Sequence, residues 1–352
     1  MTELDRLVDQ AHSSELFSAP HLEPDLARFL REGAPRVREI ARDARRRGTR
    51  SVFFVGAGGS WASMYSGKEL CDRFTGVPAD VSLSYELVWR APRRLDDGAL
   101  VFLASYSGAT EDTLAAAELC RSRGARTVAL VRREDSPLAQ LADEVVAYDS
   151  PGLYCLPLAA VAAFACEWGR LDGNVEAEAV LDGLQALPAA VGTAYRDGGP
   201  RGLERAQALR DAELLYCLGA GPLYGLAYKF ALTVFMENMR IHGSVIESAE
   251  FRHGPAEMLD RRRPDVTVLV GRDASRRMTE RSIEVIRSRA GRVIAFDAAD
   301  HPDVHPLLAA FPLKVELQWF IAHSAFLRGI TDLDERVLMG HRVLAEGGAT
   351  WP

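Results

Sequence analysis

Short apolar runs alternate with stretches of helical periodicity through most of the first half of the chain. The apolar runs lie at residues 51–55, 81–83, 99–104 and 127–131. Each is followed by a longer segment in which apolar residues recur at helical spacing. Strands that alternate with helices indicate a parallel sheet covered by helices on both faces. The pattern therefore predicts an α/β fold, preceded by a helical segment at residues 1–48 that ends in a run of arginines and Gly48.

The second half repeats this pattern, with apolar runs at residues 214–218, 265–270 and 292–296. Gly56-Ala-Gly58 matches Gly219-Ala-Gly221 at an offset of 163 residues, and residues 121–130 match residues 287–296 at an offset of 166. Two similar offsets predict an internal duplication of one α/β unit. We expect a join rich in glycine and proline near Leu181–Gly202. The expected division is residues 1–48, 49–190 for the first unit, 191–345 for the second and 346–352 as a tail.

Composition narrows the class of protein. The 352 residues carry a net charge of -7 with 48% hydrophobic residues, which excludes disorder and argues against a nucleic-acid partner. Five cysteines form no C-x-x-C pair, so we expect buried, reduced thiols and a cytoplasmic protein. The N-terminus lacks the features of a signal peptide. The longest apolar run, Leu153 to Trp168, is too short to span a membrane and contains Pro157, which predicts a buried helix and no membrane partner.

The first glycine-rich loop suggests anion binding. Gly58, Gly59 and Ser60 lie between a predicted strand and a predicted helix, where backbone N–H groups can approach a ligand. A dinucleotide fingerprint fails because Trp61 stands where its last glycine would be. Turns of this kind also contain glycine for packing reasons alone.

The second loop, Ser105-Tyr-Ser-Gly-Ala-Thr110, carries hydroxyl groups on Ser105, Ser107 and Thr110. Hydroxyls and free helix N–H groups suit a phosphate dianion, whereas capping of the next helix by Ser107 or Thr110 explains the pattern equally well. Ser60 in the neighbouring loop favours phosphate. The second half lacks both sets of residues, so we predict one anion site per chain.

Candidate acid–base groups are concentrated between residues 237 and 257. Glu237 follows an apolar helix predicted from Leu223 to about Met239, and a buried carboxyl group there would suit proton transfer. An ion pair with Arg240 at i+3 is the structural alternative and, by spacing alone, the better one. His253 precedes Gly254-Pro255 in a turn, where it either meets a ligand or stabilises the turn. Glu247 and Glu250 are expected to order the loop or support the site. No metal spacing emerges, and His301 and His305 are expected in a surface loop.

These motifs resemble the sugar isomerase (SIS) domain family, with two SIS units in tandem, each a doubly wound parallel sheet. The loops at Gly58–Ser60 and Ser105–Thr110 resemble the sugar-phosphate loops of the isomerase half of glucosamine-6-phosphate synthase. His242-Gly-Ser-Val-Ile-Glu-Ser-Ala-Glu-Phe-Arg-His-Gly-Pro255 resembles the fructoselysine-6-phosphate deglycase family more closely. The resemblance implies that Glu237 transfers protons, that His253 opens the sugar ring, and that a homodimer shares its active sites.

The same resemblance implies a deglycase that converts a fructosamine 6-phosphate to glucose 6-phosphate and free amine, without metal or other cofactor. The synthase has a lysine in its C-terminal tail, and His341 stands near that place here. This departure weakens any transfer of the synthase reaction. A sugar-phosphate isomerase or amino-sugar-6-phosphate deaminase remains an alternative, and so does a sugar-phosphate-sensing regulator of another class.

Overall fold

A computed structural model describes residues 2–336 of the chain and contains two parallel β-sheets. The first sheet has the strand order β2-β1-β3-β4-β5. Its strands are β1 (Ser51–Gly56), β2 (Ala79–Leu83), β3 (Ala99–Ser105), β4 (Arg126–Val131) and β5 (Glu144–Ala147). Every residue of β1 and β3 is buried, as their continuous apolar runs require of central strands covered on both faces. The predicted α/β fold is confirmed.

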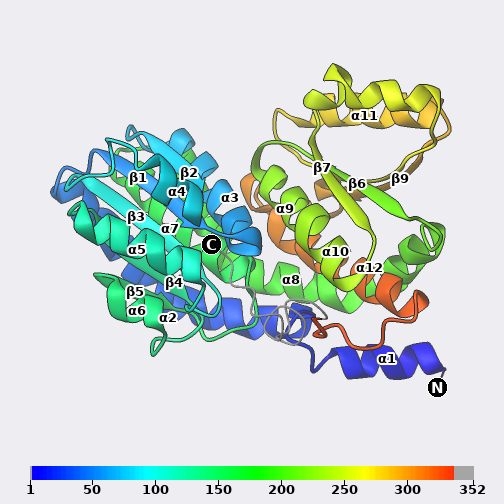
Figure 1. The fold of residues 1–352 in the computed structure, drawn as a ribbon, viewed down its shortest axis with the longest axis horizontal. Helices are drawn as coiled ribbons and strands as arrows, with labels where there is room; N and C mark the ends of the chain where they lie inside the picture. Colours follow the sequence, from blue (N-terminus) through cyan, green and yellow to red (C-terminus); the bar gives the residue numbers. More distant parts are fainter. Residues whose placement is uncertain (1, 337–352) are drawn as a thin grey trace.

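The second sheet reproduces the first four strands of the first sheet. Its order is β7-β6-β8-β9, with β6 (Leu214–Gly219), β7 (His242–Glu247), β8 (Asp265–Val270) and β9 (Arg292–Asp297). β6 begins 163 residues after β1, and β9 begins 166 residues after β4. Both sheets therefore place each strand where the sequence offsets predict it. Figure 1 shows the two units side by side.

The helices fall into a shared inner layer and separate outer layers. They are α1 (Glu3–Ala11), α2 (Ala19–Arg46), α3 (Gly58–Phe74), α4 (Ser84–Arg90), α5 (Glu111–Ser122), α6 (Pro137–Leu141), α7 (Cys155–Leu171), α8 (Val175–Ala208), α9 (Tyr224–Tyr228), α10 (Phe235–Asn238), α11 (Arg276–Ser288) and α12 (Ala310–Leu327). A π-helical segment, η2 (Lys229–Val234), joins α9 to α10. Short 3₁₀ turns are η1 (Gly221–Leu223), η3 (Glu250–His253), η4 (Pro255–Asp260), η5 (Ala298–Asp300) and η6 (Pro306–Leu308).

Alternate side chains of the central strands enter different cores. Val52 and Phe54 of β1 belong to one large core that also contains residues of the second unit, whereas Phe53 and Val55 belong to a smaller core under α5. This is the two-residue period of a strand. The inner faces of the two sheets therefore share one continuous core, and each outer face is covered separately.

The helix α8 corrects the expected join between the units. The glycine- and proline-rich stretch Leu181–Gly202 lies inside this continuous helix rather than in a linker. Gly198 and Gly202 let Trp319 of α12 approach closely, since a Cβ atom on either would lie 2.5 or 2.7 Å from the Trp319 side chain. The glycines thus serve helix packing. The division into two domains at residue 190 remains a prediction.

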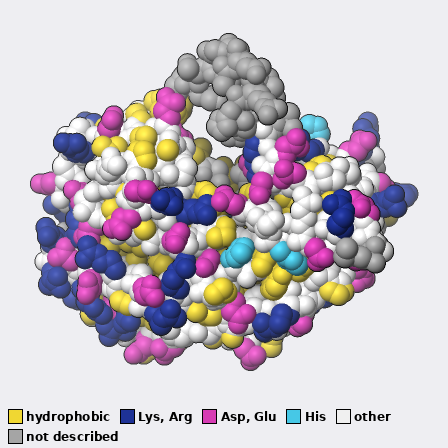
Figure 2. Space-filling model, turned by 90° about the horizontal axis from the view of Figure 1, so that it is seen from below, with side chains coloured by type: hydrophobic (Ala, Val, Ile, Leu, Met, Phe, Trp, Pro, Cys, Tyr) yellow, Lys and Arg dark blue, Asp and Glu magenta, His cyan; other side chains and the backbone are white. Residues whose placement is uncertain are grey.

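Two helices of the inner layer are buried on all sides. The apolar run that we expected to be a buried helix is α7, with every residue from Cys155 to Gly169 buried. Among residues 2–336, no helix is long and apolar enough to cross a membrane. All five cysteines are free and buried, as predicted. On the face shown in Figure 2, acidic and basic side chains are interspersed.

Candidate active site

The turn after β1 leaves the N-terminus of α3 open to a ligand. Ala57 precedes α3 in an extended conformation and provides no side-chain cap, and Gly58 has a φ of +51°. The first N–H groups of a helix attract anions when no side chain satisfies them. The Ser60 side chain lies in this first turn of α3. The turn therefore has the backbone geometry that the sequence analysis assigned to anion binding.

The serine-rich turn after β3 lies beside it, since β1 and β3 are paired with Gly56 opposite Ala104. Within the turn, Ser105 Oγ and Thr110 Oγ1 lie 2.7 Å apart, and Ser105 Oγ accepts a hydrogen bond from the Gly108 N–H at 3.1 Å. Ser107 Oγ accepts one from the Ala109 N–H at 3.2 Å. Thr110 stands at the N-cap of α5, but its side chain makes no capping hydrogen bond. The hydroxyls order the turn, and the capping alternative is wrong.

A helix of the second unit lies against the glycine turn. Trp61 of α3 and Tyr228 of α9 have ring centroids 4.3 Å apart. A Cβ atom on Gly58 would lie 3.7 Å from Thr233 Cγ2, and one on Gly59 would lie 2.8 Å from Lys229 Nζ. Gly59 therefore allows the lysine to approach the backbone of the turn. Lys229, Thr233 and Glu237 follow one another at intervals of four residues along this helix.

Glu237 is positioned at the end of that helix and is less buried than we expected. Its side chain is 35% exposed, and its carboxylate lies 3.2 Å from an Arg336 nitrogen. Arg240 instead donates to the backbone carbonyl of Glu237 at 3.0 Å and pairs with Glu335 at 3.2 Å. The expected side-chain ion pair with Arg240 is therefore replaced by one with Arg336. A half-exposed carboxylate at this place is accessible to a ligand.

Lys229 was not singled out in the sequence analysis. Its side chain is buried, and burial lowers the pKa of the ammonium group to about 8, opposed by attraction to Glu237. The sequence signal was the charged residue in an otherwise apolar helical run, Leu226 to Val234. That signal was available, but a lysine can also extend its amine to solvent along an apolar surface, so the pattern alone did not identify it.

A cavity of about 390 Å³ adjoins Lys229 and extends to the serine-rich turn through Tyr106. It is closed by the segments at residues 15–18, 151–154 and 334–336 and by α12. Leu333 and Asp334 tie these walls together: the Leu333 carbonyl accepts from Asn238 at 2.8 Å, and Asp334 accepts from Ser14 at 2.8 Å. Ligands of parallel α/β sheets bind at the carboxyl ends of the strands, where this cavity lies.

His253 lies in the exposed turn η3, and its Nε2 is 2.9 Å from Arg252 Nε. The Glu247 carboxylate accepts hydrogen bonds from the N–H groups of Ala249 at 2.6 Å and Glu250 at 3.2 Å, so it orders this loop. The Glu250 residue is exposed. Within residues 2–336, the hydrogen bonds of His253 do not join it to Glu237. His341 lies outside the described residues.

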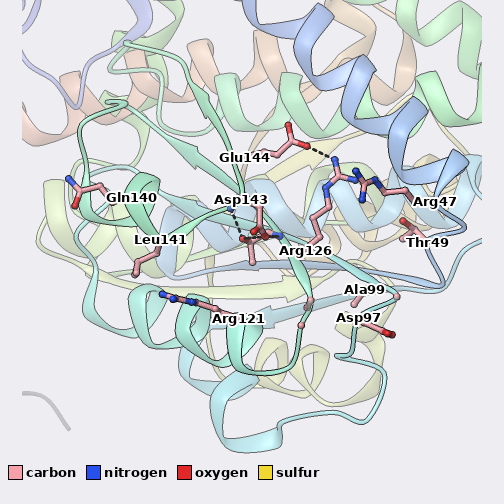
Figure 3. A pocket seen from close by; sticks show the side chains of 14 residues that line it. Arg47, Thr49, Asp97, Ala99, Arg121, Arg126, Gln140, Leu141, Asp143 and Glu144 are labelled. Atoms are coloured by element: carbon pink, nitrogen blue, oxygen red, sulfur yellow. Dashed lines mark hydrogen bonds and ion pairs between the residues drawn. The ribbon is translucent and has the colours of Figure 1, made fainter.

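The largest hollow of the protein, about 820 Å³, lies at the opposite edge of the first sheet (Figure 3). It adjoins Ala99 and Arg126, where β3 and β4 begin. Arg126 is paired with Asp43 at 2.7 Å and also with Glu144, and the Asp143 carboxylate accepts from Thr127. Its charges are already satisfied by one another, so we do not place the active site there.

The described part of the chain contains no group of three or more His, Cys, Asp or Glu side chains suited to a metal ion. The expectation that His301 lies in a surface loop is wrong, because His301 is buried and its Nε2 is 2.8 Å from the Glu316 carboxylate. His305 Nδ1 accepts from the Leu307 N–H at the start of η6. Both histidines therefore have structural partners.

Comparison with known proteins agrees with this architecture. Residues 47–154, which hold both candidate anion turns, match the SIS domain model. The fold is that of the C-terminal domain of the glucosamine-fructose-6-phosphate aminotransferase from Francisella tularensis, with a TM-score of 0.80 over 92% of this chain and 98% of that one at 20% identity. The fold and these turns define a protein built of SIS-type units, as the sequence predicted.

The chain belongs more narrowly to the fructoselysine 6-phosphate deglycase family. It is 32% identical to the fructoselysine 6-phosphate deglycase of Escherichia coli K12 over 84% of this chain and 87% of that protein. It is 31% identical to the fructosamine deglycase FrlB of Bacillus subtilis strain 168 over 71% of this chain and 77% of that one. The family resemblance read from residues 242–255 is thus confirmed. The roles of the individual site residues remain predictions.

Proposed function

We propose that the protein is a fructosamine 6-phosphate deglycase that releases glucose 6-phosphate and a free amine, such as lysine, from an Amadori product. One observation carries the proposal: the helix ending in Glu237 packs by Lys229 and Thr233 against the glycine turn of the first unit. This brings a half-exposed carboxylate and an anion-binding turn to the same edge of the molecule. The family relationship supports the same substrate class.

In this proposal, the phosphate binds at Gly58, Gly59 and Ser60 together with Ser105, Ser107 and Thr110. The N–H groups at the start of α3 face it, and hydroxyl groups complete the shell. His253 opens the cyclic substrate by moving a proton at the hemiketal. Glu237 then removes a proton from C1 and returns one at C2, which gives the imine of glucose 6-phosphate. Water hydrolyses this imine. No step requires a cofactor, because the carbonyl group at C2 acidifies the C1 protons.

The experiment that tests this function is incubation of the purified protein with a panel of fructosamine 6-phosphates. The amine should be varied between lysine, other amino acids and ammonia, with fructose 6-phosphate and glucosamine 6-phosphate in parallel. Release of glucose 6-phosphate and amine from the adducts supports the deglycase. Turnover confined to fructose 6-phosphate or glucosamine 6-phosphate would instead identify an isomerase or a deaminase, and binding without turnover would indicate a sensor.

We further propose a cytoplasmic homodimer in which each active site takes His253 from the other subunit. The exposure of His253 and the lack of a hydrogen bond to Glu237 within residues 2–336 support this arrangement. The test is to mix the inactive variants Glu237→Gln and His253→Ala under conditions that exchange subunits. A shared site predicts that mixed dimers regain one complete site and measurable turnover. If the mixture stays inactive after exchange is verified, each chain supplies both residues.

A further inference from the structure

Lys229 has no hydrogen-bond partner for its ammonium group among residues 2–336, although its side chain is only 8% exposed. It adjoins the cavity of about 390 Å³ described above. Its carbonyl accepts a hydrogen bond from Thr233 Oγ1 at 2.5 Å, which fixes the backbone but leaves Nζ unused. A buried charge without a partner is costly, and such groups are enriched at functional sites. The arrangement therefore calls for a partner supplied by a ligand.

A second lysine in the same cavity shows what a satisfied structural lysine looks like here. Lys314 of α12 donates to Ser18 Oγ at 2.6 Å and to Gln318 Oε1 at 2.8 Å. Burial lowers the pKa of Lys314 to about 8, as it does for Lys229. The two amines thus share burial and acidity but differ in hydrogen bonding. This difference separates a lysine that holds the fold together from one that is available to substrate.

The position of Lys229 indicates which substrate atom it would meet. Its Nζ lies next to Gly59, where the phosphate is proposed to bind, and its helix continues for two further turns to Glu237. Lys229 therefore lies between the proposed phosphate site and the proposed proton-transfer group. In a ketosamine 6-phosphate that spans these two ends, the oxygen at C2 is the atom that gains negative charge when a C1 proton leaves. A cation placed at such an oxygen stabilises the transition state.

We propose that Lys229 is a catalytic residue whose ammonium group donates a hydrogen bond, and then its proton, to the C2 oxygen of the open-chain substrate. This inference rests on the proposed deglycase function and adds a residue to it. Lys229 would act together with Glu237, each on a different atom of the same C1–C2 unit.

The proton and electron balance is complete without another reactant. Glu237 takes a proton from C1, the C–H electron pair forms the C1–C2 double bond, and the carbonyl pair moves to the C2 oxygen. That oxygen takes the proton from Lys229 and becomes a hydroxyl group. Glu237 then protonates C2, while the nitrogen lone pair forms the C1 iminium. Water adds to C1, the amine leaves, and Lys229 recovers its proton from solvent.

Other ionisable groups around Lys229 must be considered in any pH dependence. Glu237 favours its charged form, whereas Arg336 opposes it. The remaining groups are Cys155 of α7, Lys314 of α12, and the cavity residues Glu15, Tyr106, Tyr154 and Asp334. The Lys229 proton is needed in this mechanism, and the pKa of Lys229 is lowered to about 8, so activity should fall as the pH rises through that value.

The test is the pH profile of kcat for the wild type, Lys229→Met, Lys229→Arg and Lys314→Met on the best fructosamine 6-phosphate. Wild type should lose activity above about pH 8. Lys229→Met should lower kcat by about 10²–10³-fold, the usual effect of removing one oxyanion donor. Its residual activity should lack the alkaline limb. Lys229→Arg should move that limb upward by at least about one pH unit, because guanidinium stays protonated. Lys314→Met should keep the wild-type limb.

Thermal unfolding shows whether each variant is folded. If Lys229→Arg does not fold, the Lys229→Met profile decides, since methionine is apolar and close in size. An active wild type whose alkaline limb persists in Lys229→Met, or whose kcat is unaffected by that change, overturns this inference alone. A wild-type protein that turns over no fructosamine 6-phosphate overturns the proposed function and this inference together.

Discussion

The turn after β1 and the turn after β6 follow the same backbone path but contain different side chains. Ala57 and Ala220 are both extended, and Gly58 and Gly221 both have a φ of +51°. In the first unit the turn continues with Gly59 and Ser60, whereas the second unit has Pro222 and Leu223. Proline removes an N–H group and leucine removes a hydroxyl, so the second turn has fewer donors for an anion.

The neighbouring turns differ in the same sense. The turn after β3 presents the hydroxyls of Ser105, Ser107 and Thr110. The equivalent turn after β8 contains Asp273, whose carboxylate accepts from the Ser275 N–H at 2.8 Å and lies close to Gly271. The second unit thus satisfies its own turn with an internal carboxylate. Duplication conserved the backbone, and the side chains decide which copy has room for a phosphate.

A third difference lies in what each helix presents to the other unit. Position 229 of the second unit corresponds to Ser66 of the first at the offset of 163 residues. Ser66 Oγ donates to the Pro222 carbonyl at 3.3 Å, whereas Lys229 Nζ approaches Gly59. Glu237 corresponds in the same way to Phe74, which is buried. The first unit therefore offers the anion turns, and the second supplies the acid–base helix.

The largest expected effect comes from Glu237→Gln, which removes the proton carrier supplied by the second unit. General acid–base catalysis contributes about 10²–10⁴-fold per transfer, so we expect turnover to fall at least that far. Fructose 6-phosphate binding, measured by calorimetry, should remain. Glu257→Gln on the exposed turn η4 is the matched control and should leave kcat unchanged. Normal turnover by Glu237→Gln would remove this residue from the mechanism.

A comparison of stability between the units gives the next largest effect. The buried Glu167 of α7 lies 2.8 Å from each of Arg38, Arg42 and Arg170. Burial by itself would raise the pKa of Glu167, but these hydrogen bonds lower it to about 2. The stability that this carboxylate contributes is present above its unfolded pKa of about 4.5 and is lost as the pH falls through about 2.

Glu167→Gln should therefore lower the free energy of unfolding by about 2–3 kcal/mol at pH 7, measured by urea denaturation. The difference from wild type should shrink as the pH falls from about 4.5 toward 2. Glu316 of α12 plays the corresponding part in the second unit, with Arg205 and His301 as partners. Equal losses in Glu167→Gln at pH 7 and at pH 2.5 would argue against a contribution from the charged carboxylate.

A smaller effect distinguishes the two anion turns directly. Ser60→Ala removes a hydroxyl from the first unit and should raise KM by about 5–10-fold, which corresponds to about 1–1.5 kcal/mol for one hydrogen bond to a charged group. The effect should appear in KM rather than kcat if the phosphate binds there. Ser275→Ala in the second unit is the control and should leave both constants unchanged. Equal effects of the two variants would contradict a single anion site per chain.

The smallest expected effect is that of Asp273→Asn in the second unit. An amide oxygen can still accept the Ser275 N–H, so stability should change by less than about 1 kcal/mol. Steady-state KM and kcat should equal those of the wild type. A raised KM would show that the turn after β8 contributes to substrate binding after all.

Much of this protein could be predicted from the sequence because its signals are local. The buried runs of β1 and β3 and the periodic helices fixed an α/β fold, since strands and helices bury different patterns of side chains. Two glycine turns at one offset predicted the duplication, and Gly58, Ser60 and the serine-rich turn were recognised from hydroxyls beside helix N-termini. The stretch Leu181–Gly202 failed as a linker because its glycines serve the packing of Trp319, a contact that lies far away in sequence.

What tertiary structure decided are relations between distant segments. The sequence alone determined the fold class, the repeat and the residues with acid–base chemistry. It did not show that Glu237 pairs with Arg336 rather than Arg240, because that partner comes from a segment nearly a hundred residues away. Nor did it show that Lys229 reaches Gly59 across the two units without a hydrogen-bond partner among residues 2–336. Hydrogen bonding and desolvation depend on every neighbour in space, and the linear chain gives only the neighbours in sequence.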